Sequence, residues 1–127
     1  MEKDNSMTNG EALAALNGFI EIMNGHDEEM PVKFSYRLMT NVRCLRDELK
    51  TYDDVYKKII SKYGNGNDIS PDDEENYNKA LKEINELNDE KIDIELKKIS
   101  IHDIEDMNLT FKELTVIDSF MIDDSVE

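Results

Sequence analysis

Few residues in the chain have side chains that could support catalysis or metal binding, because it contains only two histidines and one cysteine. His26 lies in an acidic stretch after the first predicted helix, His102 follows a predicted strand, and Cys44 lies within a predicted long helix. No two of them have the spacing of a zinc or redox motif such as HExxH or CxxC. We therefore predict solvated histidines and a partly packed cysteine. We expect no catalytic residue, no cofactor and no metal ligand, and hence no enzyme.

The loop "NGNDISPDDEE", residues 65–75, has the acidic character of a calcium loop but lacks the D-x-D-x-D-G pattern. Its carboxylates suit the beginning of a helix, because the positive end of the helix dipole attracts them. Ser70 is a good N-cap and Pro71 a good first-turn residue. The sequence also lacks GxxxxGK[ST], GxGxxG and GxSxG, which are typical of nucleotide-binding sites and hydrolases.

The charge of the chain is strongly negative, with a formal value of −15 and a pI near 4.4. The second half, residues 65–127, carries nineteen acids and six bases, whereas residues 1–64 carry eleven acids and nine bases. Such a charge disfavours direct binding to nucleic acid or to anionic membranes and favours a protein partner with a basic surface. No apolar run approaches the roughly 20 residues that span a bilayer, so we expect a cytoplasmic protein.

Three predicted helices must position the histidine, cysteine and acidic residues described above. The first covers residues 9–25, the second is a long helix over residues 31–63 that ends at Gly64, and the third covers residues 71–90. The long helix has a seam of the coiled-coil type, because its apolar residues alternate gaps of four and three. The predicted apolar faces are Leu13, Leu16, Ile20 and Met23; then Leu38, Val42, Leu45, Leu49, Tyr52, Tyr56, Ile59 and Tyr63; then Tyr77, Leu81, Ile84 and Leu87.

A change of period follows the third helix. In "KIDIELKKISI", residues 91–101, apolar residues alternate with acids and then change phase at Lys97 and Lys98, which predicts a strand with a bend. A strand needs a partner for its backbone groups, and we expect either residues 30–34 or a second copy of the chain. A capping box at Thr110 and Glu113 then predicts a short last helix. Its expected apolar face is Leu114, Ile117, Phe120 and Met121.

These elements predict a mainly α fold, an antiparallel helical hairpin or bundle around one long central helix, with a minor β element before a short C-terminal helix. We expect a single domain over residues 1–127, because 127 residues suit one modest core. Its predicted parts are a flexible N-terminus at residues 1–9, two helices at 10–63, a loop at 64–70, and the acidic helix, strand and last helix at 71–127. The tyrosines on the long helix, with the nearby Tyr36, could stack on bases, but core packing is the favoured interpretation.

The stretches "MPVKFSYRLMTNVRCLRDELKTYDDVYKKIISKYG", "IDIELKKISIHDI" and "LTFKELTVIDSFMID", together with the acidic helix, resemble a family of small uncharacterised proteins of phages and prophages of Gram-positive bacteria. The resemblance runs from about residue 10 to the end, while the first ten residues and the "GNGND" loop do not share it. It implies phage origin, expression in the bacterial cytoplasm and no enzyme activity. It supplies no functional residues.

We therefore expect a non-enzymatic protein-binding module that inhibits a host defence or nucleic-acid-processing protein, by nucleic-acid mimicry or by occlusion. The alternative is a structural or assembly role in the virion, and a homodimer is possible in either case. An acidic surface that is only solvated explains the charge equally well. The residues expected to bind the partner are Asp72, Asp73, Glu74, Glu75, Glu83, Glu86, Ile92, Ile94 and Leu96.

Overall fold

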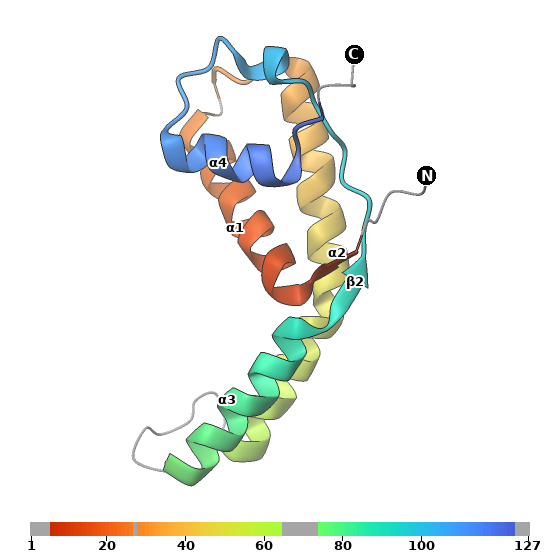
Figure 1. The fold of residues 1–127 in the computed structure, drawn as a ribbon, viewed down its shortest axis with the longest axis vertical. Helices are drawn as coiled ribbons and strands as arrows, with labels where there is room; N and C mark the ends of the chain where they lie inside the picture. Colours follow the sequence, from red (N-terminus) through yellow and green to blue (C-terminus); the bar gives the residue numbers. More distant parts are fainter. Residues whose placement is uncertain (1–5, 27, 65–73, 124–127) are drawn as a thin grey trace.

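A computed structural model of the protein describes residues 6–26, 28–64 and 74–123. Within these ranges the helices are α1 (Asn9–His26), α2 (Val32–Tyr63), α3 (Glu74–Asp89) and α4 (Phe111–Phe120), with a short 3-10 helix, η1 (Ile101–Ile104). Two short strands, β1 (Ser6–Thr8) and β2 (Lys91–Asp93), form an antiparallel sheet (Figure 1). The prediction of a mainly α fold with a minor β element is confirmed.

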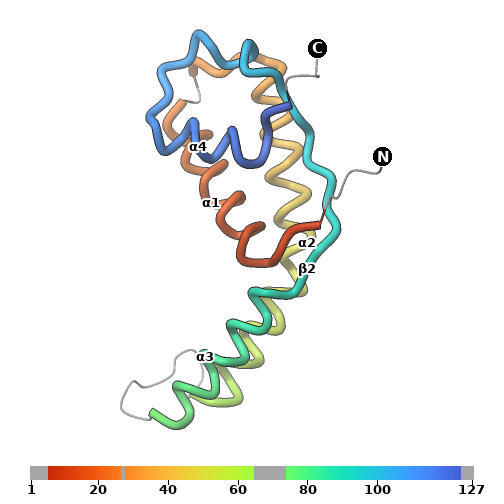
Figure 2. The backbone as a smooth tube through the Cα atoms, in the orientation of Figure 1, coloured from red at the N-terminus to blue at the C-terminus, as the bar shows by residue number. Residues whose placement is uncertain are grey.

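The long helix α2 runs through the whole molecule and divides it into two regions (Figures 1 and 2). Its first half packs with α1 and η1, and α4 packs on α1. These elements and the segment 94–107 share one core, and we call this region the head. Its second half, residues 50–63, packs with α3 in a two-helix projection that we call the arm. Because α1 and α3 both fold back along α2, the predicted helical hairpin around one long helix is confirmed. The helix ends as expected, with the Gly64 N–H donating to the Ile60 carbonyl at 2.8 Å.

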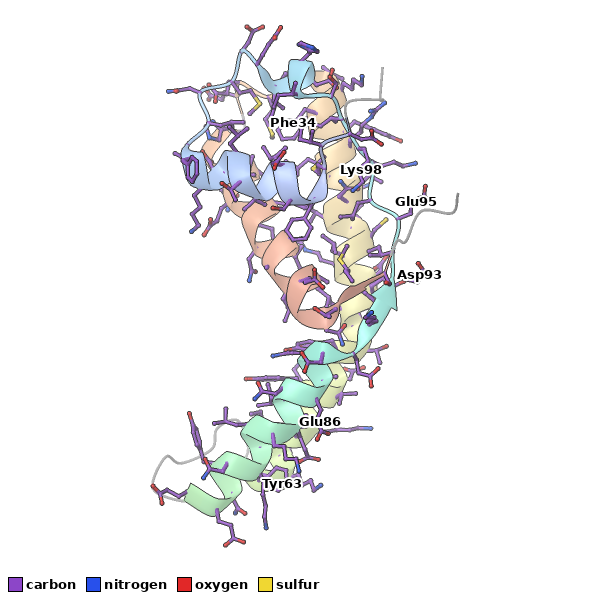
Figure 3. The ribbon with its side chains drawn as sticks, viewed as in Figure 1. Phe34, Tyr63, Glu86, Asp93, Glu95 and Lys98 are labelled. Carbon is purple, nitrogen blue, oxygen red and sulfur yellow. The ribbon has the colours of Figure 1, made fainter. Side chains whose placement is uncertain are left out.

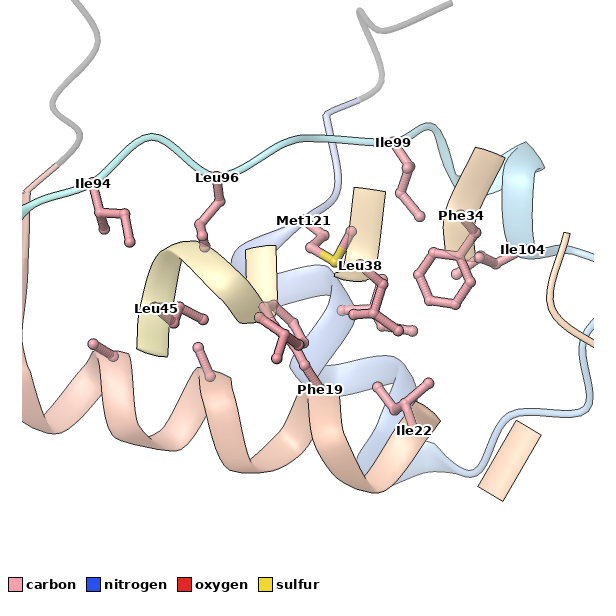
Figure 4. Packing of buried hydrophobic residues seen from close by; sticks show 14 of the residues in the cluster. Phe19, Ile22, Phe34, Leu38, Leu45, Ile94, Leu96, Ile99, Ile104 and Met121 are labelled. Carbon is pink, nitrogen blue, oxygen red and sulfur yellow. The ribbon is translucent and has the colours of Figure 1, made fainter. Parts of the chain in front are cut away.

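The head contains the main hydrophobic core. Figure 4 shows side chains of α1 and of the segment 94–99 approaching from opposite sides, with Phe34, Leu38 and Leu45 of α2 between them. The ring of Phe19 also meets Phe120 edge to face, with centroids 6.2 Å apart. The buried residues of this core are Ala12, Ala15, Phe19, Ile22, Phe34, Leu38, Val42, Leu45, Leu49, Ile94, Leu96, Ile99, Ile104, Met107, Ile117 and Met121.

The face that α1 buries differs from the predicted one. The buried stripe is Ala12, Ala15, Phe19 and Ile22, whereas the predicted residues Leu13, Leu16, Ile20 and Met23 are half-buried beside it. The reason is close packing, because small residues let other elements approach the helix. A Cβ atom on Gly18 would lie only 2.7 Å from a methyl group of Val116 on α4, so a larger residue there would force Val116 to shift. The predicted helical period was correct, but the predicted apolar stripe lies one residue after the buried one.

The partner predicted for the strand was wrong. Residues 32–34 belong to α2, and β2 instead pairs with β1, with Met7 opposite Ile92. Residues 6–8 are therefore part of a sheet, although residues 1–9 were expected to be flexible. A capping box fixes the turn from β1 into α1: the Glu11 N–H donates to the Thr8 hydroxyl at 3.1 Å, and the Thr8 N–H donates to the Glu11 carboxylate at 3.0 Å.

Beyond β2 the extended chain is held by side chains of α2. Asn41, which is fully buried, donates to the Lys97 carbonyl at 3.0 Å and accepts from the Lys97 N–H at 2.7 Å. The Arg37 guanidinium donates to the Lys98 carbonyl at 2.6 Å. The predicted strand with a change of phase is confirmed only in part, because the regular strand covers Lys91–Asp93 alone and Ile101 is 40% exposed at the start of η1. Ile94 and Leu96 are buried, and Ile99, three residues later, is buried again. Its N–H donates to the Met121 carbonyl at 2.8 Å.

The last helix, α4, begins as predicted. The Glu113 N–H donates to the Thr110 hydroxyl and the Thr110 N–H donates to the Glu113 carboxylate, which completes the expected capping box. Ile117 is buried on its predicted apolar face, and Met121 is buried at its C-cap position. Leu114, expected on the same face, is 38% exposed and lies outside the core.

Candidate functional site

The acidic residues expected to bind a partner do not form one surface. Asp72 and Asp73 lie outside the described residues, as do the predicted cap residues Ser70 and Pro71. Glu74 and Glu86 are exposed on α3, and Figure 3 shows Glu86 on the outside of the arm. Glu75 is exposed as well, but it forms a salt bridge within α3, with the Lys79 ammonium 3.1 Å from its carboxylate.

Glu83 is engaged inside the arm. The Lys62 ammonium of α2 lies 3.4 Å from its carboxylate and 4.9 Å from the centre of the Tyr63 ring. The Tyr63 hydroxyl and Lys62 together hold the pKa of Glu83 below its ordinary value. This carboxylate therefore joins α2 to α3, which leaves Glu74 and Glu86 as the predicted acids that face solvent most freely.

The apolar residues of the predicted strand are not available to a partner. Ile94 and Leu96 lie in the head core, and Ile92 is half-buried opposite Met7 in the sheet. Figure 3 shows that Asp93 and Glu95, which alternate with them, point away from the molecule. The segment was predicted to pair with residues 30–34 or with a second copy, but β2 pairs with β1, and Asn41 binds both backbone groups of Lys97.

The arm exposes apolar side chains of its own. Ala80 is buried against Ile59 of α2, whereas Tyr77 and Leu81, predicted to face the core, are 39% and 40% exposed. A thin two-helix contact cannot cover the whole apolar face of α3, so one flank stays in solvent. Tyr56 on α2 is 36% exposed. We call Tyr56, Tyr77 and Leu81 the arm strip.

The contacts of Tyr52 place Tyr56 on the same flank of the arm as Tyr77 and Leu81. The ring of Tyr52 stacks on that of Tyr56, with centroids 6.1 Å apart, and its hydroxyl donates to the Asn88 side chain at 2.7 Å. Burial raises the pKa of Tyr52, which keeps this hydroxyl protonated as the donor. Asn88 lies on the helical stripe of Tyr77 and Leu81, at gaps of four and seven residues along α3.

His26 is not the solvated histidine that we expected. Its Nε2 atom lies 2.9 Å from both carboxylate oxygens of Glu113, and its Nδ1 atom contacts the Glu29 carboxylate. Carboxylates only accept hydrogen bonds, so both ring nitrogens donate and the ring is an imidazolium. The hydrogen bonds to Glu113 and Glu29 accordingly raise the pKa of His26. The cluster links the C-terminal end of α1 to the capping box of α4, which is a structural role.

The other residues with potential chemistry lie where the sequence predicted. The His102 side chain is exposed and pairs with Glu105 at 3.3 Å, and Cys44 is half-buried on α2. Across residues 6–26, 28–64 and 74–123, no three histidine, cysteine, aspartate or glutamate side chains are grouped to hold a metal ion.

A second apolar surface lies at the far end of the head. A hollow of about 190 Å³ is lined by Ile104 and Met107 on the inside and by the more exposed Ile101 and Leu114. Phe111, one turn before Leu114 on α4, is 89% exposed. The head and the arm therefore each expose apolar side chains, on surfaces at different ends of the molecule.

Comparisons with protein-family models, with curated proteins and with solved structures found no match. Phage origin therefore rests on the sequence resemblance alone and stays a prediction. Among the helices of the described ranges, none is both long and apolar enough to cross a membrane.

Proposed function

We propose that the protein is a non-enzymatic protein-binding module, encoded by a phage, whose binding element is the arm. The observation that carries the proposal is the arm strip on a two-helix element that projects from the head (Figure 1). The groups with shifted pKa values at His26, Glu83, Asp103 and Glu113 are all explained by caps or salt bridges that stabilise the fold. A binding role accounts for these features better than a catalytic one.

The character of the arm suggests how it would recognise a partner. Glu74 is exposed one turn before Tyr77, so the strip combines apolar side chains with a neighbouring carboxylate. Such a surface suits a shallow apolar groove with a basic rim. Salt bridges within the arm occupy Glu75 and Glu83, so the arm does not present a continuous row of free carboxylates like the phosphates of a nucleic acid. This supports occlusion of a basic site on a host nucleic-acid-processing or defence protein, rather than mimicry of nucleic acid.

The test is affinity capture from phage-infected Gram-positive cells followed by mass spectrometry. We expect the wild-type protein and the Phe111→Ser variant to capture the same partner, because Phe111 lies on the head. The double variant Tyr77→Ser, Leu81→Ser should lose that partner while keeping its helical circular-dichroism spectrum. A nuclease or polymerase as the partner supports host inhibition, and tail proteins support the virion role. Unchanged capture by the double variant contradicts the arm as the binding element.

A further inference from the structure

The outer face of α2 in the head carries an uncovered stripe of apolar and basic side chains. Val32 is 86% exposed, Tyr36 is 70% exposed, and Met39 is partly exposed. These residues follow each other at gaps of four and three, and Arg43 and Arg46 continue the same face in the next two turns, where both are exposed. We call these five residues the outer stripe. Tyr36 was expected to pack in the core with the other tyrosines, but it lies in solvent.

The helical segment that carries the outer stripe is basic, although Lys33 within it is paired with Asp103 at 3.3 Å. Residues 32–46 contain four bases, Lys33, Arg37, Arg43 and Arg46, and no acid, in a chain whose net charge is −15. Beside Tyr36 lies a hollow of about 400 Å³, lined by Arg37, Lys97 and Lys98 and also by Glu95, Leu96 and Asp123. Figure 3 shows Lys98 beside this part of α2. An apolar stripe with basic neighbours suits a partner segment that is apolar and acidic.

The chain itself carries a surface of that chemistry. The arm strip is apolar, and α3 carries five acids and two lysines over Glu74–Asp89. Within one copy the two surfaces cannot meet, because α3 packs on the second half of α2 while the outer stripe lies on the first half, in the head (Figure 1). Contact between them therefore requires a second copy of the chain.

We infer that the outer stripe of one copy binds the arm strip and the neighbouring acids of a second copy. Val32, Tyr36 and Met39 would cover Tyr77 and Leu81. Arg43 and Arg46 would meet Glu74 and Glu75, and Glu75 would exchange its contact with Lys79 for one with arginine. Arginine binds carboxylates through two parallel hydrogen bonds, which makes this pairing directional. The inference rests on the proposed function, since it names an occupant for the same arm. A bound copy would cover the arm until a partner with a more basic groove displaced it.

Two features of the contact set its expected strength. Net repulsion between two acidic copies is screened beyond about 8 Å at physiological ionic strength, so the local match of charges decides the contact. The apolar area on each side is a few side chains, which is small compared with the roughly 800 Å² per partner of a stable complex. We therefore expect a weak, concentration-dependent association. We expect a twofold dimer, in which each copy contributes its stripe to one contact and its arm strip to the other, so that both contacts form in the same pair.

The test is sedimentation equilibrium of the full chain from micromolar to millimolar concentration. The wild-type mass should rise from that of the 14.7 kDa monomer toward twice that value. The stripe variant Arg43→Glu, Arg46→Glu should weaken self-association by about tenfold or more, and so should the arm variant Glu74→Arg, Glu75→Arg. An equal mixture of these two variants should recover association, because each supplies the charge that the other has lost. The control Lys91→Glu, Lys112→Glu makes the same change in net charge as the stripe variant, away from both surfaces.

The inference is overturned if the wild type keeps its monomer mass throughout, if the control weakens association as much as the stripe variant, or if the mixture stays monomeric. Capture experiments separate this failure from a failure of the proposed function. The stripe variant should lose self-association but keep the captured partner, whereas the double variant Tyr77→Ser, Leu81→Ser should lose both. If that double variant loses self-association but still captures the partner, the proposed function is contradicted, whereas the inferred dimer contact is supported.

Discussion

The head and the arm are built on the same helix, yet their cores differ greatly. Sixteen buried apolar residues form the head core, whereas only Ile59 and Ala80 are buried in the described part of the arm core. Burial of apolar area is the main favourable term in folding, so most of the stability should reside in the head. The arm therefore depends on the head for its position. It can thus expose apolar side chains without loss of the fold.

The joint between the two regions explains how the arm is held. Asn9, at the start of α1, donates its side-chain amide to the Leu87 carbonyl at 2.9 Å and its backbone N–H to the Glu90 carbonyl at 2.9 Å. Tyr52 on α2 bonds to Asn88 from the other side. The Leu87 carbonyl also accepts from the Glu90 N–H at 3.2 Å, and Glu90 directly follows α3, so these bonds gather where the helix ends. The last turn of α3 is therefore fixed to the head, while its first turn depends on contacts within the arm.

The largest effect is expected from truncation in the head core. The Phe19→Ala variant should lose about 3 to 5 kcal/mol of unfolding free energy, because it leaves a cavity among α1, α2 and α4. Urea unfolding followed by circular dichroism measures this loss. The matched control is Phe111→Ala, which removes an exposed ring and should change stability by less than about 0.5 kcal/mol. Similar losses at the two positions would contradict the placement of the core.

A smaller but still large effect is expected at Asn41. The Asn41→Ala variant leaves the N–H and the carbonyl of Lys97 without their partners, which should cost about 2 to 4 kcal/mol. Asn85→Ala on the exposed face of α3 is the control and should stay within about 0.5 kcal/mol of the wild type. If both variants unfold at the wild-type urea midpoint, the segment 94–98 does not depend on α2.

Truncation in the arm should have a local effect. The Ile59→Ala variant should lose about 2 kcal/mol, the low end for a buried isoleucine, because solvent is close on one side. Four of the five tyrosines lie in the arm and the chain has no tryptophan, so tyrosine fluorescence reports mainly on this region. The variant should lower the urea midpoint seen by fluorescence more than the one seen by circular dichroism. Equal shifts by both probes would indicate that arm and head unfold as one unit.

The smallest expected effect is the pH dependence from His26. Its pKa is raised above the ordinary 6.5 by hydrogen bonds to Glu113 and Glu29, so its contribution is complete below pH 6.5 and is lost as pH rises through the folded pKa. Burial alone would raise the pKa of Glu113, but hydrogen bonds from Thr110 and His26 lower it below the ordinary 4.5. That contribution is present above pH 4.5 and is lost as pH falls.

The measurement is the unfolding free energy at several pH values for the wild type and for the His26→Gln variant. The wild type should lose its advantage over the variant as pH rises above 6.5 and through the raised pKa of His26, where the imidazolium loses its proton. His102→Gln is the control, because its side chain is exposed and it joins no second helix. A constant difference between wild type and His26→Gln across this range would show that the cluster is not charged.

Much of the fold could be predicted from local signals. The capping box at Thr110 and Glu113 and the glycine that ends α2 act through neighbours in the sequence, so the sequence alone locates them. The change of phase after Leu96 was likewise readable from the alternation of apolar residues. The capping box at Thr8 and Glu11 has the same T-x-x-E signature and could have been found in the same way. It would have located the start of α1 and shortened the segment predicted to be flexible.

Other features could not be predicted, because they depend on residues far apart in the sequence. The buried face of α1 is set by the close approach of Val116 to Gly18, and apolar period alone does not distinguish neighbouring stripes. The strand partner at residues 6–8 is too short to show alternation. Asn41 was the one available signal: a polar residue between Leu38 and Leu45 on the buried face of a long helix indicates that something there needs a hydrogen bond.

The arm strip was missed for a related reason. Tyr77 and Leu81 fit the helical period of a buried face, and the sequence does not show that only one helix is present to cover them. The acids nearby suggested a binding surface, but their salt bridges to Lys62 and Lys79 depend on the fold.

The central claim, that a stable head carries an arm of low local stability, is tested most directly by native-state hydrogen exchange of the full chain. Regions that open for binding are drawn from the less stable parts of a protein. Amides in residues 53–62 and 76–84 should exchange through local opening, with lower free energies of opening than amides in residues 15–22 and 38–45. Equal opening free energies in all four segments, matching that of global unfolding, would contradict it.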